Sequence, residues 1–367
     1  MKHLTVNSFC NARGWKFIIL VGVIFSISGV IVGPSHSFSS RNEVVKIGLI
    51  PTESGVGDLS FNWMANAGLE KAETDLGVDG TVYLPTGFED YANQLQQCVN
   101  DGNALCITIG FGFIDSTVAA AQTNPGVNFA IVDVSLEAYP GNLRGISFDS
   151  AQAGYLAGTL AALMSESDVL GGIGGSFGDY KIPGVVAFLE PYENGASCIN
   201  PLTDVIITYI EGFMNQELAS QAAQAQMDAG ADVIFAVAGP AGTGALLTAT
   251  GADVWAIGVD SDQWLTVFKS GAVEGSEYML TSAMKRVDVA VYDTIEDQVL
   301  GTFSSGTVLY DLAADGVGLA EFHEAEPSIP QAVKDQLAQV KQDIVDGKID
   351  VKQPCLPWYI FLPMVLK

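Results

Sequence analysis

The chain has 367 residues, of which 49% are hydrophobic and 40 are glycine, so it is long enough for two lobes with separate cores. From residue 42 onward there are 12 lysines and arginines and 42 acids, a net charge of −30. Such a surface repels nucleic acid and anionic lipid, and we expect no nucleic-acid partner. The acidity is typical of a solvated surface and by itself indicates no specific site.

The first 41 residues have the pattern of an export segment. Lys2, Arg13 and Lys16 precede the apolar run FIILVGVIFSISGVIVG at residues 17–33, and small polar residues follow it. Residues 1–41 are therefore predicted to be a signal peptide or, since 17 apolar residues are at the short limit for a span, an uncleaved N-terminal membrane anchor. The positive charges predict an exported protein, periplasmic or at the cell surface, on the outer face of the plasma membrane.

The five cysteines leave their chemistry open. Cys98 and Cys106 could pair outside the cell and close a short loop, or remain partly buried thiols. No CxxC occurs, which gives a zinc or redox site little support. Cys10 lies before the apolar run, whereas a secreted lipoprotein carries its cysteine just after it, so we do not expect lipid anchoring by that route.

Short apolar runs rich in valine and isoleucine alternate with helical patterns along almost the whole chain. The runs include VVKIGLI, ALCITIG, NFAIVDV, DVIFAVAG and DVWAIGVD, and helical patterns such as FNWMANAGLEKAETDLG and AQAGYLAGTLAALMS lie between them. Strands buried on both faces and linked by helices predict parallel sheets joined by right-handed crossovers, that is, an α/β fold.

The strand–helix units divide into two lobes. We assign residues 42–147 plus about 265–302 to an N-terminal lobe, and 148–264 plus about 303–352 to a C-terminal lobe. The crossings between them are expected at GISFDSAQAGY and IGVDSDQWL. Residues 353–367 form an apolar tail that is too short and too rich in proline to span a membrane, and we assign it no role.

Polar, aromatic and glycine residues recur where the predicted strands end, which is where open parallel sheets bind ligands. Asp133 and Asp260 end apolar runs, where an unpartnered charge is costly, although a helix N-cap or a turn is the alternative for each. The clustering of strand ends predicts a cleft. Its candidate ligand-binding residues are Asp58, Phe61, Asn62, Gly110, Phe111, Asp133, Gly239, Gly242, Asp260 and Lys285.

These side chains suit recognition of a small molecule. Carboxylates accept paired hydrogen bonds from vicinal hydroxyls such as those of ribose, and Lys285 can donate to a sugar oxygen. An aspartate or asparagine fits the donor and acceptor edge of a purine. Aromatic rings offer flat faces to a base, and stacking contributes about 1–3 kcal/mol per base.

Support for catalysis is weak. The histidines are His3, His36 and His323, and Pro327 breaks the helix that an HExxH-like site would need, so a Ser-His-Asp triad and a histidine metal site are not expected. No GxxxxGK[ST] motif occurs, and GGIGGSFG at 171–178 misses GxGxxG by one position. We therefore expect no catalytic residue, no metal site and no cofactor.

Over residues 44–350 the chain resembles the basic membrane protein family of ABC-transporter substrate-binding proteins, in the branch similar to purine nucleoside receptors. GDLSFNWMANAGLEKA matches the family's glycine, acid and Ser-Phe-Asn signature at the start of the first helix. IGFGF, NFAIVD, AGYLAGTLAALM, ADVIFAVAG, VWAIGVDSDQ and TSAMKRVDVAVYD follow in family order.

The resemblance implies a type I periplasmic-binding fold, in which two αβα lobes joined by three crossings close on a nucleoside. It implies that Phe61 and Phe188 stack on the two faces of the base and that Asn62 and Asp133 hold its edge. It also implies that Asp260 and Lys285 hold the ribose beside the backbone of Gly239. The expected partners are a nucleoside and ABC permease subunits, and the expected state is a monomer.

The chain departs from the family pattern at three places. Leu59 stands where a basic residue is usual, Ala187 where an arginine is frequent, and Gly212-Phe213-Met214-Asn215 replaces the more usual Ser-Phe-x-Asp. Two alternatives to a nucleoside importer component stay open at this point. One is a receptor or membrane-tethered sensor for another small solute, such as a sugar or a free base. The other is an enzyme such as a nucleoside hydrolase, for which no metal–carboxylate cluster is evident.

Overall fold

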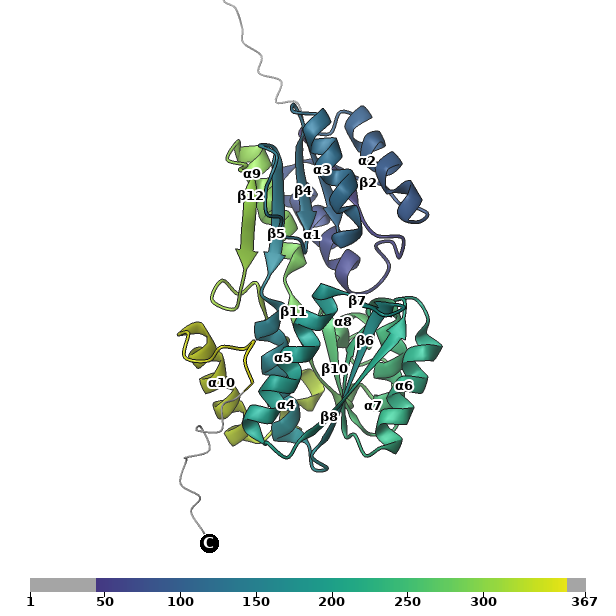
Figure 1. Ribbon diagram of the computed structural model, residues 1–367, viewed down its shortest axis with the longest axis vertical. Helices are drawn as coiled ribbons and strands as arrows, with labels where there is room; N and C mark the ends of the chain where they lie inside the picture. Colours follow the sequence, from purple (N-terminus) through teal and green to yellow (C-terminus); the bar gives the residue numbers. More distant parts are fainter. Residues whose placement is uncertain (1–43, 355–367) are drawn as a thin grey trace, which may run out of the picture. The chain divides into compact units, whose positions relative to one another are not determined.

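The computed structural model describes residues 44–354, which form one compact unit built around two sheets (Figure 1). The predicted export or anchor segment at 1–41 and almost all of the predicted tail at 353–367 lie outside these residues. Among the helices described, none is both long and apolar enough to cross a membrane.

The first sheet has six strands in the order β12-β5-β4-β3-β1-β2, and every pair in it is parallel. Helices α1 and α9 pack against each other, and so do α2 and α3. The elements of this first lobe are β1 (Lys46–Ile50), α1 (Phe61–Leu76), β2 (Asp79–Val82), α2 (Tyr91–Asn100), β3 (Leu105–Ile109), α3 (Ile114–Thr123), β4 (Asn128–Val132), β5 (Leu143–Phe148), α9 (Val287–Leu300) and β12 (Gly306–Tyr310).

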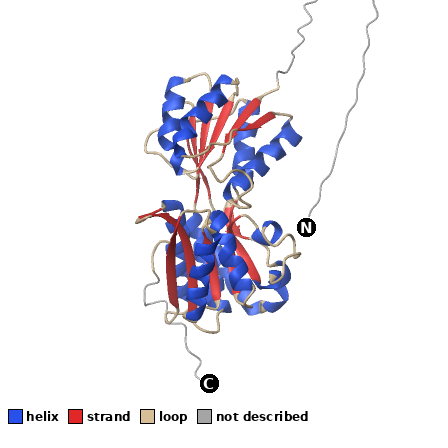
Figure 2. Ribbon diagram, turned by 90° about the vertical axis from the view of Figure 1, so that its right-hand side faces the viewer, coloured by secondary structure: helices blue, strands red, loops and turns tan. Residues whose placement is uncertain are grey.

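The second sheet has seven strands in the order β13-β11-β10-β9-β6-β7, with β8 paired to β6. The short strands β7 and β13 are antiparallel to their neighbours and the other pairs are parallel. Figure 2 shows helices on both sides of each sheet. The elements of this second lobe are α4 (Ser150–Met164), β6 (Val169–Phe177), β7 (Tyr180–Lys181), α5 (Pro183–Ile199), β8 (Asp204–Glu211), α6 (Gln216–Asp228), β9 (Val233–Val237), α7 (Gly239–Thr250), β10 (Trp255–Asp260), α8 (Gln263–Thr266), β11 (Met279–Lys285), β13 (Val317–Leu319) and α10 (Gln331–Val345).

The chain passes between the sheets three times: from β5 to α4, from β11 to α9, and from β12 to β13. The first crossing lies where the sequence predicted it. The second does not, because β11 stays beside β10 in the second sheet, and β12 joins β5 in the first. Strand β11, which lies in the segment 265–302 predicted for the N-terminal lobe, therefore belongs to the second lobe. Strand β12, which lies in the segment 303–352 predicted for the C-terminal lobe, belongs to the first. Both strands are short apolar runs, and such a run carries no signal for the sheet it will join.

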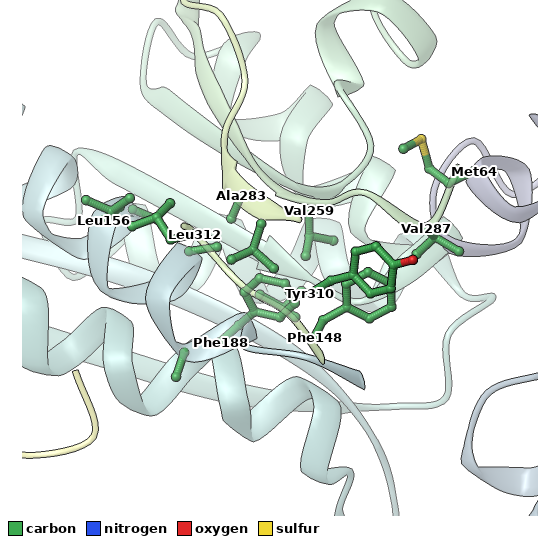
Figure 3. Close-up of a cluster of buried hydrophobic side chains, with 14 of the residues drawn as sticks. Met64, Phe148, Leu156, Phe188, Val259, Ala283, Val287, Tyr310 and Leu312 are labelled. Atoms are coloured by element: carbon green, nitrogen blue, oxygen red, sulfur yellow. The ribbon is translucent and has the colours of Figure 1, made fainter. Parts of the chain in front are cut away.

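Apolar side chains fill the region of the crossings. The rings of Phe148 at the end of β5 and Tyr310 at the end of β12 have centroids 5.5 Å apart. They belong to one buried cluster with Leu312 and Phe188 (Figure 3). The strands that link the lobes are therefore packed by a shared core.

Helix α5, which brings Phe188 to this core, lies unusually close to α4. A Cβ built on Gly154 would lie 2.3 Å from the carbonyl oxygen of Phe188, and one on Gly158 only 1.9 Å from that of Tyr192. No side chain fits at these points. Two glycines one helical turn apart therefore set the distance between the helices.

A disulfide joins Cys98 on α2 to Cys106 on β3, and settles the pairing that the sequence left open. Both residues are fully buried. The bridge closes a short loop on one face of the first sheet and restricts the unfolded chain.

We expect Gly158→Ala to lower the free energy of unfolding by about 2 kcal/mol or more, because the new methyl group forces α4 and α5 apart. Urea unfolding followed by circular dichroism measures this. Gly242→Ala in α7 is the matched control, since its Cβ would meet atoms no closer than 3.5 Å and alanine favours a helix. Equal unfolding midpoints for the two variants would contradict the packing argument.

Candidate ligand-binding site

The carboxyl ends of strands from both sheets surround a cavity of about 380 Å³. Ten side chains and glycines predicted from the sequence line it, among other residues. They are Asp58, Phe61, Asn62, Gly110, Phe111, Asp133, Phe188, Gly239, Asp260 and Lys285. Gly242 is one turn further into α7 and does not line the cavity.

The carboxylate of Asp58 is fully engaged in hydrogen bonds with neighbouring residues of the protein. Its Oδ1 accepts hydrogen bonds from the backbone N–H groups of Ser60 (3.1 Å) and Trp63 (2.8 Å). Its Oδ2 accepts from the backbone (2.9 Å) and side-chain (3.0 Å) nitrogens of Asn62. Burial raises the pKa of Asp58, and these hydrogen bonds oppose that shift. With four donors bound, the carboxylate has no capacity left for a ligand, so Asp58 caps the first turn of α1.

Asn62 is similarly engaged. Its side-chain amide donates to Thr52 Oγ1 (2.8 Å) and to Asp58, and its Oδ1 accepts from the backbone N–H of Thr52 (3.1 Å). Both donor hydrogens are used. Asn62 therefore has one acceptor position left to offer, fewer groups than the sequence-based role at the edge of a base needs.

An ion pair joins the two sheets beneath the cavity. Lys285 Nζ at the end of β11 lies 2.7 Å from Oδ2 of Asp133, which follows β4. Lys285 is only 3% exposed. Its ammonium also lies 5.4 Å from the ring centroid of Phe61 and 5.1 Å from that of Phe188, within the range of cation–π attraction.

Asp260, the last residue of β10, also lines the cavity and is close enough to Lys285 and Asp133 to interact with their charges. Burial raises its pKa to about 6; Lys285 opposes this shift, whereas Asp133 and Asp58 add to it. Asp260 and Asp133 have φ angles of +64° and +63°. This left-handed backbone is uncommon outside glycine and turns each acid sharply out of its strand.

Glycines bring the backbone close to the cavity at two strand ends. Gly110, with a φ of +92°, follows β3, and a Cβ there would lie 3.7 Å from the ring of Phe61. Gly239, with a φ of +51°, begins α7 after β9. Both sites favour glycine, and they leave room for the aromatic side chains beside them.

The aromatic lining differs from the sequence-based assignment. Phe188 is 1% exposed and packs at 81° to Phe235 in the core, so its ring offers little surface to a ligand. Phe213, which the sequence marks only as part of a departure from the family pattern, is partly buried and lines the cavity. Its ring lies over Gly175, where a Cβ would be 2.3 Å away. The glycine-rich run at 171–178, interpreted as a strand and turn, was the signal that could have pointed to it.

More aromatic residues meet between the two lobes beside the cavity. Phe88 of the first lobe packs edge-on against Phe177 of the second, with ring centroids 5.9 Å apart. The rings of Phe111 and Tyr180 are tilted by 49° to each other, with centroids 6.3 Å apart. Phe177 also packs against Phe213. Aromatic rings from both lobes therefore contribute to the lining.

The charges of the lining are mostly negative: five acids and one base. The acids are Glu53, Asp58, Asp133, Glu211 and Asp260, and the base is Lys285. Within residues 44–354, no group of three or more histidine, cysteine or acidic side chains is arranged to hold a metal ion. His323 lies away from the cavity, stacked on Trp264 and 2.7 Å from Asp262.

Residues 44–354 match the family model for ABC transporter substrate-binding proteins of the PnrA-like type. The chain belongs to this family. Among PnrA-like relatives, the ABC transporter nucleoside-binding protein BmpA of Lactococcus lactis is 32% identical over 356 residues, covering 92% of this chain and 99% of that protein. The CD4+ T-cell-stimulating antigen of Listeria monocytogenes is 31% identical over 360 residues, covering 92% and 98%.

Solved structures agree on the fold. A solute-binding protein of an ABC transporter from Aeropyrum pernix matches with a TM-score of 0.74 and 24% identity, over 83% of this chain and 92% of that one. A solute-binding protein from Conexibacter woesei matches with a TM-score of 0.66 and 22% identity, over 84% and 98%. This PnrA-like chain therefore has the type I periplasmic-binding fold that the sequence predicted.

We expect Asp260→Asn to be more stable than the wild type at pH 8, with the difference shrinking by about 1 kcal/mol at pH 5. The raised pKa means that the folded protein holds a proton between about pH 6 and the ordinary value of 3.8, where the unfolded chain has released it. This carboxyl therefore favours folding more as the pH falls through that window. Thermal unfolding from pH 5 to pH 8 measures the effect, and a constant difference between the proteins would contradict it.

Proposed function

We propose that this PnrA-like protein binds a nucleoside, preferably a purine nucleoside, in the cavity and delivers it to an ABC permease. One observation carries the proposal: the buried Lys285 and Asp260, with the partly buried Asp133, lie next to aromatic rings in a cavity of about 380 Å³. The protein's relative in Lactococcus lactis, named as an ABC transporter nucleoside-binding protein, supports the proposal.

The base is held by aromatic faces. Phe61 opens α1 beside Gly110 and supplies one face, with the Lys285 ammonium near its ring. Phe213 supplies the other face, because it is partly exposed to the cavity whereas Phe188 is buried in the core. A purine presents more surface than a pyrimidine to such rings, which is the reason for the preference.

The ribose is held by the charged group. Asp260 has one carboxylate oxygen bound to Ser60 and its other oxygen to offer to a hydroxyl. Lys285 has three donor hydrogens, of which Asp133 binds one, so it donates to a sugar oxygen as well. Asp133 and the remaining acceptor of Asn62 face the edge of the base.

Charge selects a nucleoside over a nucleotide. The cavity has five acidic side chains against one base, and that base is already paired with Asp133. A phosphate would meet uncompensated negative charge in a partly desolvated site, which is strongly unfavourable.

We further propose that the protein is exported by its first 41 residues, works as a monomer at the outer face of the plasma membrane, and catalyses no reaction. The support is the charge pattern around residues 17–33 and membership of a substrate-binding family. A receptor for a sugar or a free base is the alternative within the same fold.

Calorimetric titration tests the ligand class. The protein is first freed of co-purified ligand by unfolding and refolding, then titrated with adenosine, guanosine, inosine, cytidine, ribose and AMP. We expect purine nucleosides to bind at least tenfold more tightly than cytidine, ribose or AMP. A tenfold difference in affinity corresponds to about 1.4 kcal/mol of binding free energy. No binding by a refolded protein that unfolds cooperatively would refute the nucleoside assignment. Release of free base from inosine would show an enzyme instead.

We expect Phe61→Ala and Phe213→Ala to weaken guanosine binding by about tenfold or more, because each removes one stacking face. Phe303→Ala is the matched control. Its ring is partly buried against Arg144 and does not line the cavity. The same titration measures all three variants. If Phe188→Ala weakened binding while Phe213→Ala did not, the second stacking face would belong to Phe188 instead.

A further inference from the structure

The turn at residues 58–60 belongs to the first lobe by sequence, and its last two residues make hydrogen bonds with the second lobe. The carbonyl oxygen of Leu59 accepts hydrogen bonds from Ser261 Oγ (2.7 Å) and Thr266 Oγ1 (3.1 Å). Both donors follow β10 in the second lobe. The turn is therefore docked on the loop that carries Asp260.

The Leu59 side chain reinforces this docking. It packs against the apolar cluster of the second lobe that contains Val267 and Phe268. Its φ of +56° is left-handed, a costly conformation for a bulky side chain. The contacts of Leu59 with the second lobe compensate for this strain, and they account for an apolar residue where the family usually has a basic one.

Ser60, the next residue, reaches Asp260 directly. Its hydroxyl lies 3.1 Å from Asp260 Oδ2 and 3.3 Å from the carbonyl oxygen of Val259. Ser60 is fully buried and does not line the cavity, so it cannot touch a ligand. Any effect it has on binding acts through Asp260.

We propose that Ser60 is a positioning residue: its hydroxyl, carried by the first lobe, orients the Asp260 carboxylate of the second lobe while the 58–60 turn is docked. The docking of the lobes and the assembly of the ligand site are then one event. The inference rests on the proposed function in one respect, that Asp260 contacts the ligand.

The charged groups around Asp260 predict how loss of the Ser60 hydroxyl changes the pKa of Asp260. Lys285 at the end of β11 favours the ionised carboxylate, whereas Asp133 after β4 and Asp58 in the turn disfavour it. The Ser60 hydrogen bond also favours the ionised form. Without this hydrogen bond, one of the two interactions that lower the pKa of Asp260 is lost. The negative charges of Asp133 and Asp58 then raise that pKa further, and Asp260 holds its proton to a higher pH.

Ser60→Ala tests the inference, with Ser60→Thr as the variant that keeps the hydroxyl. Ser261→Ala is the control, because it removes a docking contact without touching Asp260. Two quantities are measured on each protein. One is the titration of the Asp260 carboxyl carbon by NMR without ligand, identified by its absence in Asp260→Asn. The other is the affinity for guanosine from pH 5.5 to pH 8.5.

We expect Ser60→Ala to raise the pKa of Asp260 by about one unit. Because the ligand needs the ionised carboxylate, guanosine binding then weakens by about threefold at pH 6.5 and about eightfold at pH 5.5, and the loss vanishes by pH 8.5. Ser60→Thr restores the wild-type pH profile. Ser261→Ala weakens binding by the same factor at every pH and leaves the titration of Asp260 in place.

A pH-independent loss in Ser60→Ala, with the Asp260 titration unchanged, would overturn the inference and leave Ser60 a packing residue. If Ser60→Ala does not fold, Ser60→Cys, whose thiol is a weaker donor, decides by the same titration. If the wild type binds no nucleoside, the proposed function fails. A shift of the Asp260 titration in the ligand-free variants still supports the positioning role, and its absence refutes it.

Discussion

The ion pair between Lys285 and Asp133 is the constraint around which the cavity is built. The two side chains come from different sheets, and their 2.7 Å contact is largely removed from water. A buried ammonium is tolerated only when it is paired, so this contact requires the ends of β4 and β11 to face each other. Phe61, Phe188 and Asp260 also lie around the Lys285 ammonium. Separating these strand ends would leave the Lys285 ammonium without a partner, so the ion pair favours their juxtaposition.

Several polar side chains of the lining already form hydrogen bonds within the protein and have few groups left for a ligand. Asp58 binds the backbone at the start of α1, and Asn62 ties that turn to Thr52. This leaves Phe61 with a fixed ring facing the cavity. Rigid support of this kind lowers the entropy lost when a flat ligand is bound, because the aromatic face does not have to be ordered at that moment.

The strong acidity of the protein has two different meanings. The net charge of −30 beyond residue 41 lies mostly on the surface, where it disfavours contact with polyanions. In the cavity, acids outnumber the single lysine by five to one, although Asp58 is occupied by the start of α1. Under the proposed function, the remaining acids favour hydroxyl and amino groups and disfavour phosphates. Surface charge acts less on a ligand, because salt screens it within about 10 Å.

The sequence by itself determined the fold class, the first crossing and the strand ends that line the cavity, because short apolar runs, helical patterns and strand-end acids are local signals. It did not determine the sheets of β11 and β12, since an apolar strand pairs equally well in either. Only the tertiary structure decided that Asp58 caps α1, that Phe188 is almost fully buried whereas Phe213 is only partly so, and that Ser60 reaches Asp260. Those roles depend on which hydrogen-bonding groups and ring faces remain free after folding. Contacts between residues far apart in the sequence decide this, as between Ser60 and Asp260, which are 200 positions apart.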